Sequence, residues 1–304
     1  METLTSSLTQ VLYSVPYFAV LLGILWVAKL AYDAITPFKF KEQLVGDDAK
    51  PANPAFGTHY ALWMIGLAIA LSGALYGSLG SATGDVADLQ ADMVNIGVYG
   101  FECLILVWLS ILVNDKFILK NFKIEKELIE DRNVGTAFVT GGAAVATGLM
   151  LNGALNGESS SMVRGVVDLG VYWVVGQAIL VAAGLVFQKI TSYDIHHELE
   201  ERDNPAVGLS FGGFLVATGL ITRTSLVGAS SELLPELITT LCIGAAGLVL
   251  LGLSNKVCDL LFLPSVKLDQ ALSEKKNMSA AAVSAAISIS VGICFAFAIA
   301  ASAV

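Results

Sequence analysis

Asparagine recurs at a fixed place in this chain, at Asn53, Asn133, Asn204 and Asn277. Each of these residues ends a charged loop and begins a long apolar segment. Residues 133–149 align with 204–220 without a gap, sharing a Gly-Gly pair and an Ala-Thr-Gly-Leu run. The fourth unit, placed on the second, brings Gly292 onto Gly148. The sequence therefore predicts one two-helix unit repeated four times.

The apolar segments are long enough to cross a membrane. Of the 304 residues, 55% are hydrophobic and only 14% are charged, which cannot supply a soluble surface without large apolar patches. About 20 apolar residues cross a bilayer as a helix. Eight such stretches are centred near Leu22, Leu67, Leu104, Ala143, Ile179, Leu215, Gly247 and Ile289.

We therefore expect an all-α polytopic membrane protein with eight transmembrane helices, built from four parallel two-helix repeats. Two units make a four-helix half, and a small polar loop near 157–161 separates the halves. The expected modules are residues 1–157 and 158–304. The lipid bilayer is the first partner that this architecture implies.

Basic residues lie mostly on one side of the predicted membrane. The first, third, fifth and seventh loops, with their helix ends, hold 15 of the 17 Lys and Arg residues. By the positive-inside rule these loops are cytoplasmic. Both termini should then lie outside the cytoplasm, which in the inner membrane of a bacterium means the periplasm.

The second, fourth, sixth and eighth segments are rich in small residues, whereas the others are bulky. Small residues let membrane helices approach closely, so we expect these four to pack in the bundle interior or against a partner subunit of a homo-oligomer. The alternative is that their small faces line a narrow pathway. The candidate packing residues are Gly73, Gly77, Gly141, Gly142, Gly148, Gly208, Gly212, Gly213 and Gly219.

Three polar residues within the apolar segments are candidates for an intramembrane site. Glu102 lies near the middle of the third segment, where an ionisable group marks a functional site by default. It is either a cation ligand or proton relay, or a neutral acid bonded to a neighbouring helix. Asp168 is expected near the outer end of its helix and in reach of water, and Gln177 is expected to bond between helices.

The repeated asparagines have a structural explanation. Asparagine is a favoured N-cap, and Pro54 and Pro205 follow at the first helical position, where proline is tolerated best. We interpret Asn53, Asn133, Asn204 and Asn277 as helix caps at the cytoplasmic interface. A binding role is the less favoured alternative.

Other patterns give no enzyme, metal or cofactor. The net charge of −9 argues against nucleic acid. Residues 208–212 match GxSxG, but the strand before the serine and a histidine partner are lacking. His196-His197-Glu198 lacks metal-ligand spacing and is expected to be a solvated loop. The four cysteines are expected to be small apolar residues, neither a disulfide framework nor a metal site.

The charged approach to each asparagine carries a family resemblance. Residues 127–133 and 198–206, each followed by Gly-Gly and Ala-Thr-Gly-Leu, resemble bacterial inner-membrane proteins of the domain of unknown function 350 family, the YjfL-like proteins. Members typically have a four-helix module, so this chain would be two modules in tandem. The resemblance implies an association with envelope stress and offers no catalytic residues. Asn53 lacks the downstream Gly-Gly pattern, and Asn277 lacks the Glu-rich approach.

Two functions are open at this point. The first is a non-enzymatic channel-like or transporter-like component that passes a small ion, with Glu102 on the pathway. The alternative is a membrane scaffold for envelope-stress homeostasis that recruits a peripheral cytoplasmic protein through its charged loops.

Overall fold

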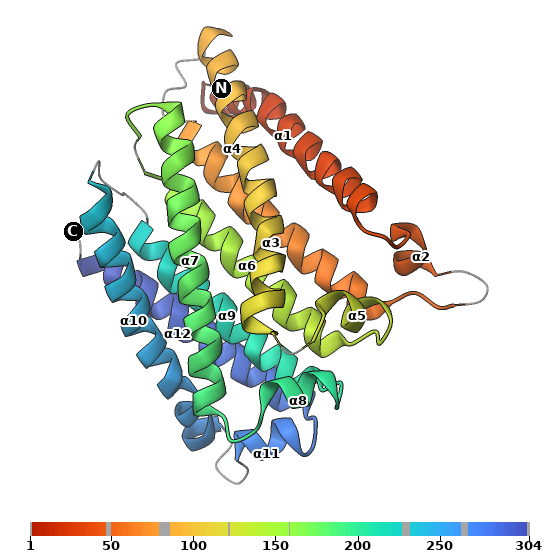
Figure 1. Cartoon of the computed structure of the whole chain (residues 1–304). Helices are drawn as coiled ribbons and strands as arrows, with labels where there is room; N and C mark the ends of the chain where they lie inside the picture. Colours follow the sequence, from red (N-terminus) through yellow and green to blue (C-terminus); the bar gives the residue numbers. More distant parts are fainter. Residues whose placement is uncertain are drawn as a thin grey trace.

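The computed structural model describes residues 2–46, 50–78, 86–120, 122–157, 159–226, 232–262 and 267–302. All regular elements within these ranges are helices (Figure 1). The long ones are α1 (Glu2–Ile35), α3 (Pro54–Ser78), α4 (Val86–Val113), α6 (Val134–Ala154), α7 (Met162–Ile190), α9 (Pro205–Leu226), α10 (Leu233–Val257) and α12 (Met278–Ser302). The short ones are α2 (Phe40–Val45), α5 (Ile124–Ile129), α8 (Ile195–Glu200) and α11 (Leu268–Ser273). Five-residue π-helical turns, Asn114–Ile118 and Cys258–Phe262, continue α4 and α10.

Within the described residues, eight helices are long and apolar enough to cross a membrane. They correspond to the eight apolar stretches of the sequence, so the predicted all-α polytopic architecture is confirmed. A bilayer is the environment that this composition requires, because the protein exposes bulky apolar side chains along most of its long helices.

Each unit consists of a bulky long helix, a short helix and a long helix rich in small residues. The four small-residue helices, α3, α6, α9 and α12, pack side by side in chain order, and we call them the inner row. The bulky helices α1, α4, α7 and α10 form the outer row, which packs over the inner one. All short helices lie at one end of the bundle, called here the short-helix end, and both termini lie at the opposite end (Figure 1).

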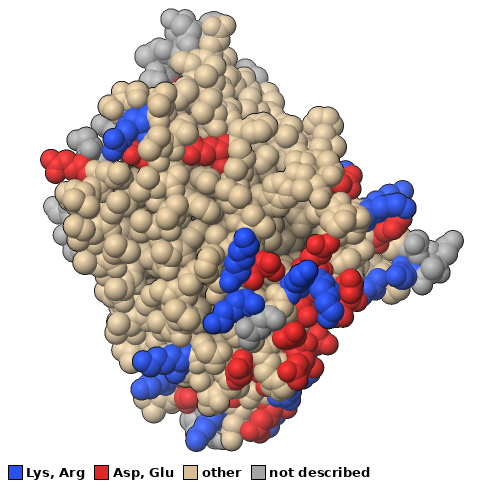
Figure 2. All heavy atoms as spheres, viewed as in Figure 1, with Lys and Arg blue, Asp and Glu red and all other residues tan. Residues whose placement is uncertain are grey.

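Charge follows the same division. Figure 2 shows most Lys, Arg, Asp and Glu side chains of this face at the short-helix end, over α2, α5, α8 and α11. A smaller charged group lies near the opposite end, and the surface between is largely uncharged. This pattern is typical of a protein whose middle contacts lipid and whose ends contact water.

The inner row has three junctions, α3–α6, α6–α9 and α9–α12, and all three share one register. The ninth residue after the asparagine of one unit lies against the eighth residue of the next unit: Leu62 on Gly141, Gly142 on Gly212, and Gly213 on Ala285. The thirteenth residue lies against the fifteenth: Gly66 on Gly148, Ala146 on Gly219, and Ala217 on Gly292. The repeat in sequence is therefore also a repeat in packing.

Close backbone approach explains the glycines of these junctions. A Cβ atom on Gly142 would lie 2.7 Å from the Cα atom of Gly212, and one on Gly148 would collide with the carbonyl oxygen of Gly66. Gly208 meets the backbone of Gly135 in the same way, and Gly73 meets the backbone of Asn152. Gly77 belongs to α3, but its surroundings lie outside the described residues.

Burial differs between the middle and the ends of the row. Of the apolar spans, 83% of α6 and 78% of α9 are buried, against 28% of α12. The inner helices in the middle of the row are enclosed by neighbours on both sides. Within the inner row, the last helix, α12, packs against α9 on one side, and no other inner-row helix of the chain covers its opposite side.

Candidate functional site

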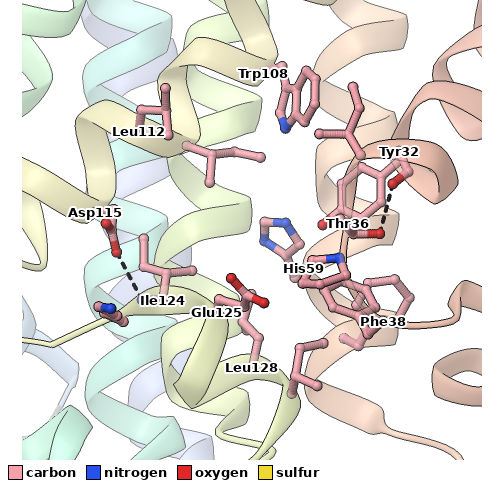
Figure 3. A pocket seen from close by; sticks show the side chains of 16 residues that line it. Tyr32, Thr36, Phe38, His59, Trp108, Leu112, Asp115, Ile124, Glu125 and Leu128 are labelled. Carbon is pink, nitrogen blue, oxygen red and sulfur yellow. Dashed lines mark hydrogen bonds between the residues drawn. The ribbon is translucent and has the colours of Figure 1, made fainter.

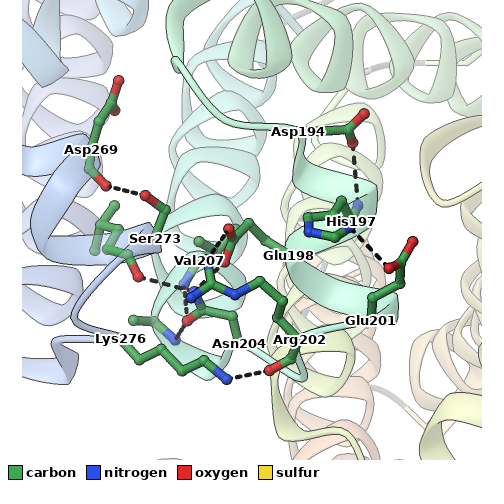
Figure 4. Close-up of polar contacts among 12 residues, drawn as sticks. Asp194, His197, Glu198, Glu201, Arg202, Asn204, Val207, Asp269, Ser273 and Lys276 are labelled. Carbon is green, nitrogen blue, oxygen red and sulfur yellow. Dashed lines mark hydrogen bonds and ion pairs between the residues drawn. The ribbon is translucent and has the colours of Figure 1, made fainter.

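A buried polar network holds the units together at the short-helix end, and Asn204 is its clearest member (Figure 4). The side-chain oxygen of Asn204 accepts hydrogen bonds from the backbone N–H groups of Ala206 and Val207, at the start of α9. Its Nδ2 donates to Glu198 Oε2 over 2.6 Å and to the carbonyl oxygen of Leu272 over 2.9 Å. The residue thus caps its own helix and also contacts the short helix of the following unit.

The same arrangement occurs in the first two units. Asn133 accepts from Thr136 N and donates to Glu127 Oε2 and to the carbonyl oxygen of Leu199. Asn53 accepts from two N–H groups of α3 and donates to Gln43 Oε1 and to the carbonyl oxygen of Leu128. Each asparagine is therefore bonded forward to the next unit.

The fourth unit keeps only the cap. Asn277 accepts from the backbone N–H groups of Ser279 and Ala280. Its backbone N–H donates to the carbonyl oxygen of Ala271, as the N–H groups of Asn133 and Asn204 donate to those of Glu127 and Glu198. Ala271 thus occupies the position of these two glutamates but has no carboxylate. Within the described part of the chain, no partner is found for Asn277 Nδ2.

The loop before each of these asparagines has a repeated backbone conformation. Arg132, Asp203 and Lys276, the residues directly before Asn133, Asn204 and Asn277, have φ angles of 55°, 45° and 47°. Residues other than glycine adopt this left-handed region at a cost of roughly 1–2 kcal/mol. The tight turn places the asparagine where it reaches both its own helix and the neighbouring unit.

The two carboxylates of this network lie in different electrostatic surroundings. Glu198 is buried and forms an ion pair with Arg202, with 2.6 Å between Oε1 and Nη1. Glu127 is buried too, but Asp131 stands four residues later in place of the arginine. Burial raises the pKa of Glu127 above its ordinary value, and the hydrogen bond from Asn133 offsets part of that rise. The expected solvated loop around His196 is instead the helix α8, with Glu198 inside.

Glu102 lies on α4 in the outer row and is partly buried. Its Oε2 atom is shielded from solvent and has no hydrogen-bond partner among the described residues. Tyr99, one turn earlier on α4, lies against Gly165 of α7 and is within electrostatic range of both Glu102 and Asp168. Tyr99 therefore stands at the contact between α4, which carries Glu102, and α7, which carries Asp168.

Unlike the shielded oxygen of Glu102, the other two intramembrane candidates each form a side-chain hydrogen bond. Asp168 lies in the second turn of α7, and its carboxylate accepts a hydrogen bond from Arg164 Nε over 2.8 Å as an ion pair near the surface. Gln177 is buried and donates to Thr147 Oγ1 of α6 over 3.0 Å, while its own Oε1 has no partner among the described residues. Gln177 thus binds outer row to inner row, away from the Glu102 contact.

Several buried polar pairs are not predicted from the sequence. Asn152 Nδ2 donates to α3, and its Oδ1 accepts from Arg223 Nε of α9 over 2.7 Å. Asn152 and Arg223 occupy the same position, nineteen residues after the asparagine, in their two units. The repeat alignment therefore contained a signal for this pair. Tyr17 Oη donates to Asp92 of the second unit, and Tyr172 Oη donates to Glu236 of the fourth. Asp92 and Glu236 each stand 41 residues before the asparagine of their unit, so the repeat contained a signal here as well.

A pocket of about 260 Å³ opens at the short-helix end between α1, α3, α4 and α5 (Figure 3). Tyr32, Trp108 and His59 line it, and the Glu125 side chain extends into the same space. The position of Glu125 in its short helix is held by His196 in the third unit and by Asp269 in the fourth. His196 Nε2 is hydrogen-bonded to the carbonyl oxygen of Ile118, and Asp269 accepts a hydrogen bond from Ser192 N. No such bond is found for Glu125 among the described residues, so its carboxylate is left facing the pocket.

No group of three or more His, Cys, Asp or Glu side chains suited to a metal ion occurs in the described ranges.

Comparison with known proteins gives the family and no activity. No curated protein and no solved structure matches the chain significantly. A model of the Domain of Unknown Function (DUF350) matches residues 5–155 and again residues 161–299. The chain therefore belongs to the DUF350 family and carries two copies of its module in tandem.

Proposed function

We propose that this polytopic membrane protein is non-enzymatic and passes a small cation, with the Glu102 carboxyl group as a binding point on the path. One observation carries the proposal: Glu102 Oε2 is shielded from solvent and has no hydrogen-bond partner among the described residues. A carboxyl group in an apolar span is costly, and an unpaired oxygen leaves a ligand position for a cation or a proton.

The placement of Glu102 favours a path along the outer row over one along the small-residue faces. The inner row packs backbone against backbone at its three junctions, so a pathway there would have to separate the helices. Glu102 lies on the outer-row helix α4, one turn from Tyr99, which contacts α7 at Gly165. In this proposal the small residues of the inner row allow the helices to pack closely, and the polar groups of the outer row bind the ion.

For the location we propose the inner membrane of a bacterium, with both termini in the periplasm. The bias of basic residues supports this orientation, because 15 of the 17 lie in the loops at one side and their helix ends. The short-helix end would then face the cytoplasm. Labelling a single cysteine introduced at Glu274 with an impermeant reagent, in intact cells and in inverted vesicles, tests the orientation.

The test of ion passage is flux in proteoliposomes. Wild type, Glu102→Gln and Glu130→Gln would be reconstituted at equal density, and cation and proton flux measured separately. Glu130 is an exposed acid of the short-helix end, so its variant controls for the loss of one charge. We expect flux in wild type and Glu130→Gln and a loss of roughly tenfold or more in Glu102→Gln, the effect of removing a charged ligand within an apolar span. Absence of flux in folded wild type, or equal flux in all three, would reject the proposal.

A second candidate function is a scaffold for envelope homeostasis that recruits a cytoplasmic protein. The observation that favours it is the concentration of charged side chains at the short-helix end (Figure 2). Site-specific photocrosslinking in cells from the α8 surface would compare wild type with Glu200→Lys/Glu201→Lys and with Glu102→Gln. Under this function the double charge reversal removes the crosslinked partner, and Glu102→Gln leaves it unchanged.

A further inference from the structure

The inner row ends in α3 at one side and in α12 at the other, and each of these helices has one face that no inner-row helix of the chain covers. We propose that a second copy of this chain continues the row, with α12 of one copy packed against α3 of the next in the register of the three junctions within the chain. This interface does not depend on ion passage.

The first argument is the composition of α12 set against its burial. Its residues 279–286 are almost all Ala and Ser, as small as the faces that α6 and α9 use to pack. Only 28% of the α12 span is buried, against 83% and 78% for those two helices. Other surfaces that face lipid carry bulky side chains such as Phe101 and Leu185. A small-residue helix suits a neighbouring helix better than lipid.

The second argument is register. In the three junctions, residues nine and thirteen after the asparagine lie against residues eight and fifteen of the next unit. In α12 the ninth and thirteenth positions are Ala286 and Ser290, and both are exposed. In α3 the eighth and fifteenth positions are Ala61 and Ala68, and both are exposed as well. The corresponding residues are buried within the row, except for the partly buried Leu62.

The four positions that would form the new contact are thus all small and all uncovered. Ala61 and Ala68 form a flat strip on α3, and Ala286 and Ser290 form one on α12. Such strips permit the backbones of two copies to approach closely. The exposed strip on α3 and the exposed strip on α12 lie at opposite ends of the inner row, so one chain cannot join them to each other. A second copy supplies the missing half of each.

The third argument is the missing forward bond of Asn277. Asn53, Asn133 and Asn204 each donate to the backbone carbonyl group of a leucine in the short helix of the following unit, namely Leu128, Leu199 and Leu272. The equivalent leucine of the first unit is Leu44, directly after Gln43. Leu44 is 38% exposed, whereas its three equivalents are at most 4% exposed. Asn277 Nδ2 of one copy and the Leu44 carbonyl oxygen of the next thus form a matching donor and acceptor.

One residue sets the spacing of this interface. Ala68 stands where the three junctions have Gly148, Gly219 and Gly292. A Cβ atom on any of those glycines would lie less than 3.0 Å from the facing backbone, and Ala68 carries such an atom. The helices of two copies must therefore be slightly further apart at that depth than the helices within a copy. The contact is heterologous, so repeated addition closes into a ring or extends as a row in the membrane plane.

Disulfide crosslinking in proteoliposomes tests the interface with the whole chain. In a Cys242→Ala/Cys294→Ala background, which removes the exposed thiols, one preparation would carry Ala286→Cys and a second Ala61→Cys, with tags of different size. We expect oxidation to give a dimer of both tags in the mixture and no dimer in either preparation alone. Leu185→Cys, on the exposed side of α7, replaces Ala286→Cys in the control mixture.

Two crosslinking results would overturn the proposal. Dimers from Ala286→Cys alone would mean that two α12 helices pair symmetrically. Crosslinking no greater than in the Leu185→Cys control would mean that lipid covers α12. As a second readout, single-molecule photobleaching would count copies per complex: Ala286→Trp should lower the count and Leu185→Trp should not. A monomeric wild type at every protein density would also reject the interface.

Discussion

The carboxamide nitrogen of Asn204 donates to the carbonyl oxygen of Leu272 over 2.9 Å, across the boundary between the third and fourth units. The same side chain caps α9 and bonds to Glu198. One residue therefore connects the local start of a helix with the assembly of the units.

Removing this side chain should cost more than removing its relative at the end of the row. Asn204→Ala loses the cap, worth about 1 kcal/mol, and two further buried hydrogen bonds of about 1 kcal/mol each, roughly 3 kcal/mol in all. Asn277→Ala loses only the cap, about 1 kcal/mol. Unfolding in mixed micelles, with the protein diluted to monomers, would measure both. Equal losses would show that the bonds between units contribute nothing to stability.

A glycine at a junction and a glycine on an open surface should respond oppositely to alanine. Gly148→Ala drives a methyl group into the carbonyl oxygen of Gly66, and we expect a loss of about 1–3 kcal/mol or more. Gly170→Ala, on α7, meets no atom within 4 Å and should gain about 0.5–1 kcal/mol from helix propensity. The same unfolding measurement compares them. A stable Gly148→Ala variant would contradict the close approach of α3 and α6.

Glu127 predicts a pH dependence of stability. Burial raises its pKa in the folded protein above the ordinary value of about 4.3, so the folded state binds the proton more tightly than the unfolded state. Stability then falls as the pH rises from about 4.3 through the raised pKa, because the charged form is disfavoured in the fold. Glu127→Gln should be more stable than wild type at neutral pH and should flatten this part of the pH profile.

Glu198→Gln is the matched control for that variant. It removes one charge of the buried ion pair with Arg202, so we expect a loss of stability at neutral pH. Unfolding measured from about pH 4 to about pH 8, the range in which a carboxyl group with a raised pKa titrates, would compare the two variants with wild type. If both variants lose stability to the same extent, the different surroundings of the two carboxylates have no energetic effect.

The turn before Asn133 offers a stabilising substitution. Arg132 has a φ of 55°, so Arg132→Gly should release strain and stabilise the protein by up to about 1 kcal/mol. Arg132→Ala removes the same side chain but keeps the strain, and it should give no gain. The melting temperatures of the two variants in detergent would decide. A gain with alanine would assign the effect to the arginine side chain.

The sequence predicts the long elements well because their signal is local. Hydropathy alone identifies the eight spans, and the spacing from Asn133 to Gly148 and from Asn204 to Gly219 predicts the repeat. Register between units then follows, because equal units packed in order repeat their contacts. The role of asparagine at a helix start is equally local.

Unlike the Asn152–Arg223 pair, the hydrogen bonds between units at the short-helix end had no comparable signal. The acceptor of Asn204 is a backbone carbonyl group, which every residue possesses, so no residue type marks it. Glu127 and Glu198 lie in charged loops typical of solvated surface, and only the fold encloses them. By contrast, the ion pair of Asp168 has a local signal, since Arg164 stands four residues earlier in a segment that the sequence predicts as a helix.

The junction between the two DUF350 copies uses the same kinds of contact as the junctions within each copy. Gly142 and Gly212 meet across the module boundary as Gly213 and Ala285 meet within the second module, and Asn133 bonds forward across that boundary. The peptide link between the copies thus adds proximity and no new kind of contact. The tandem chain is a covalent dimer, and its two halves, produced as separate polypeptides, should recognise each other and assemble into the same bundle.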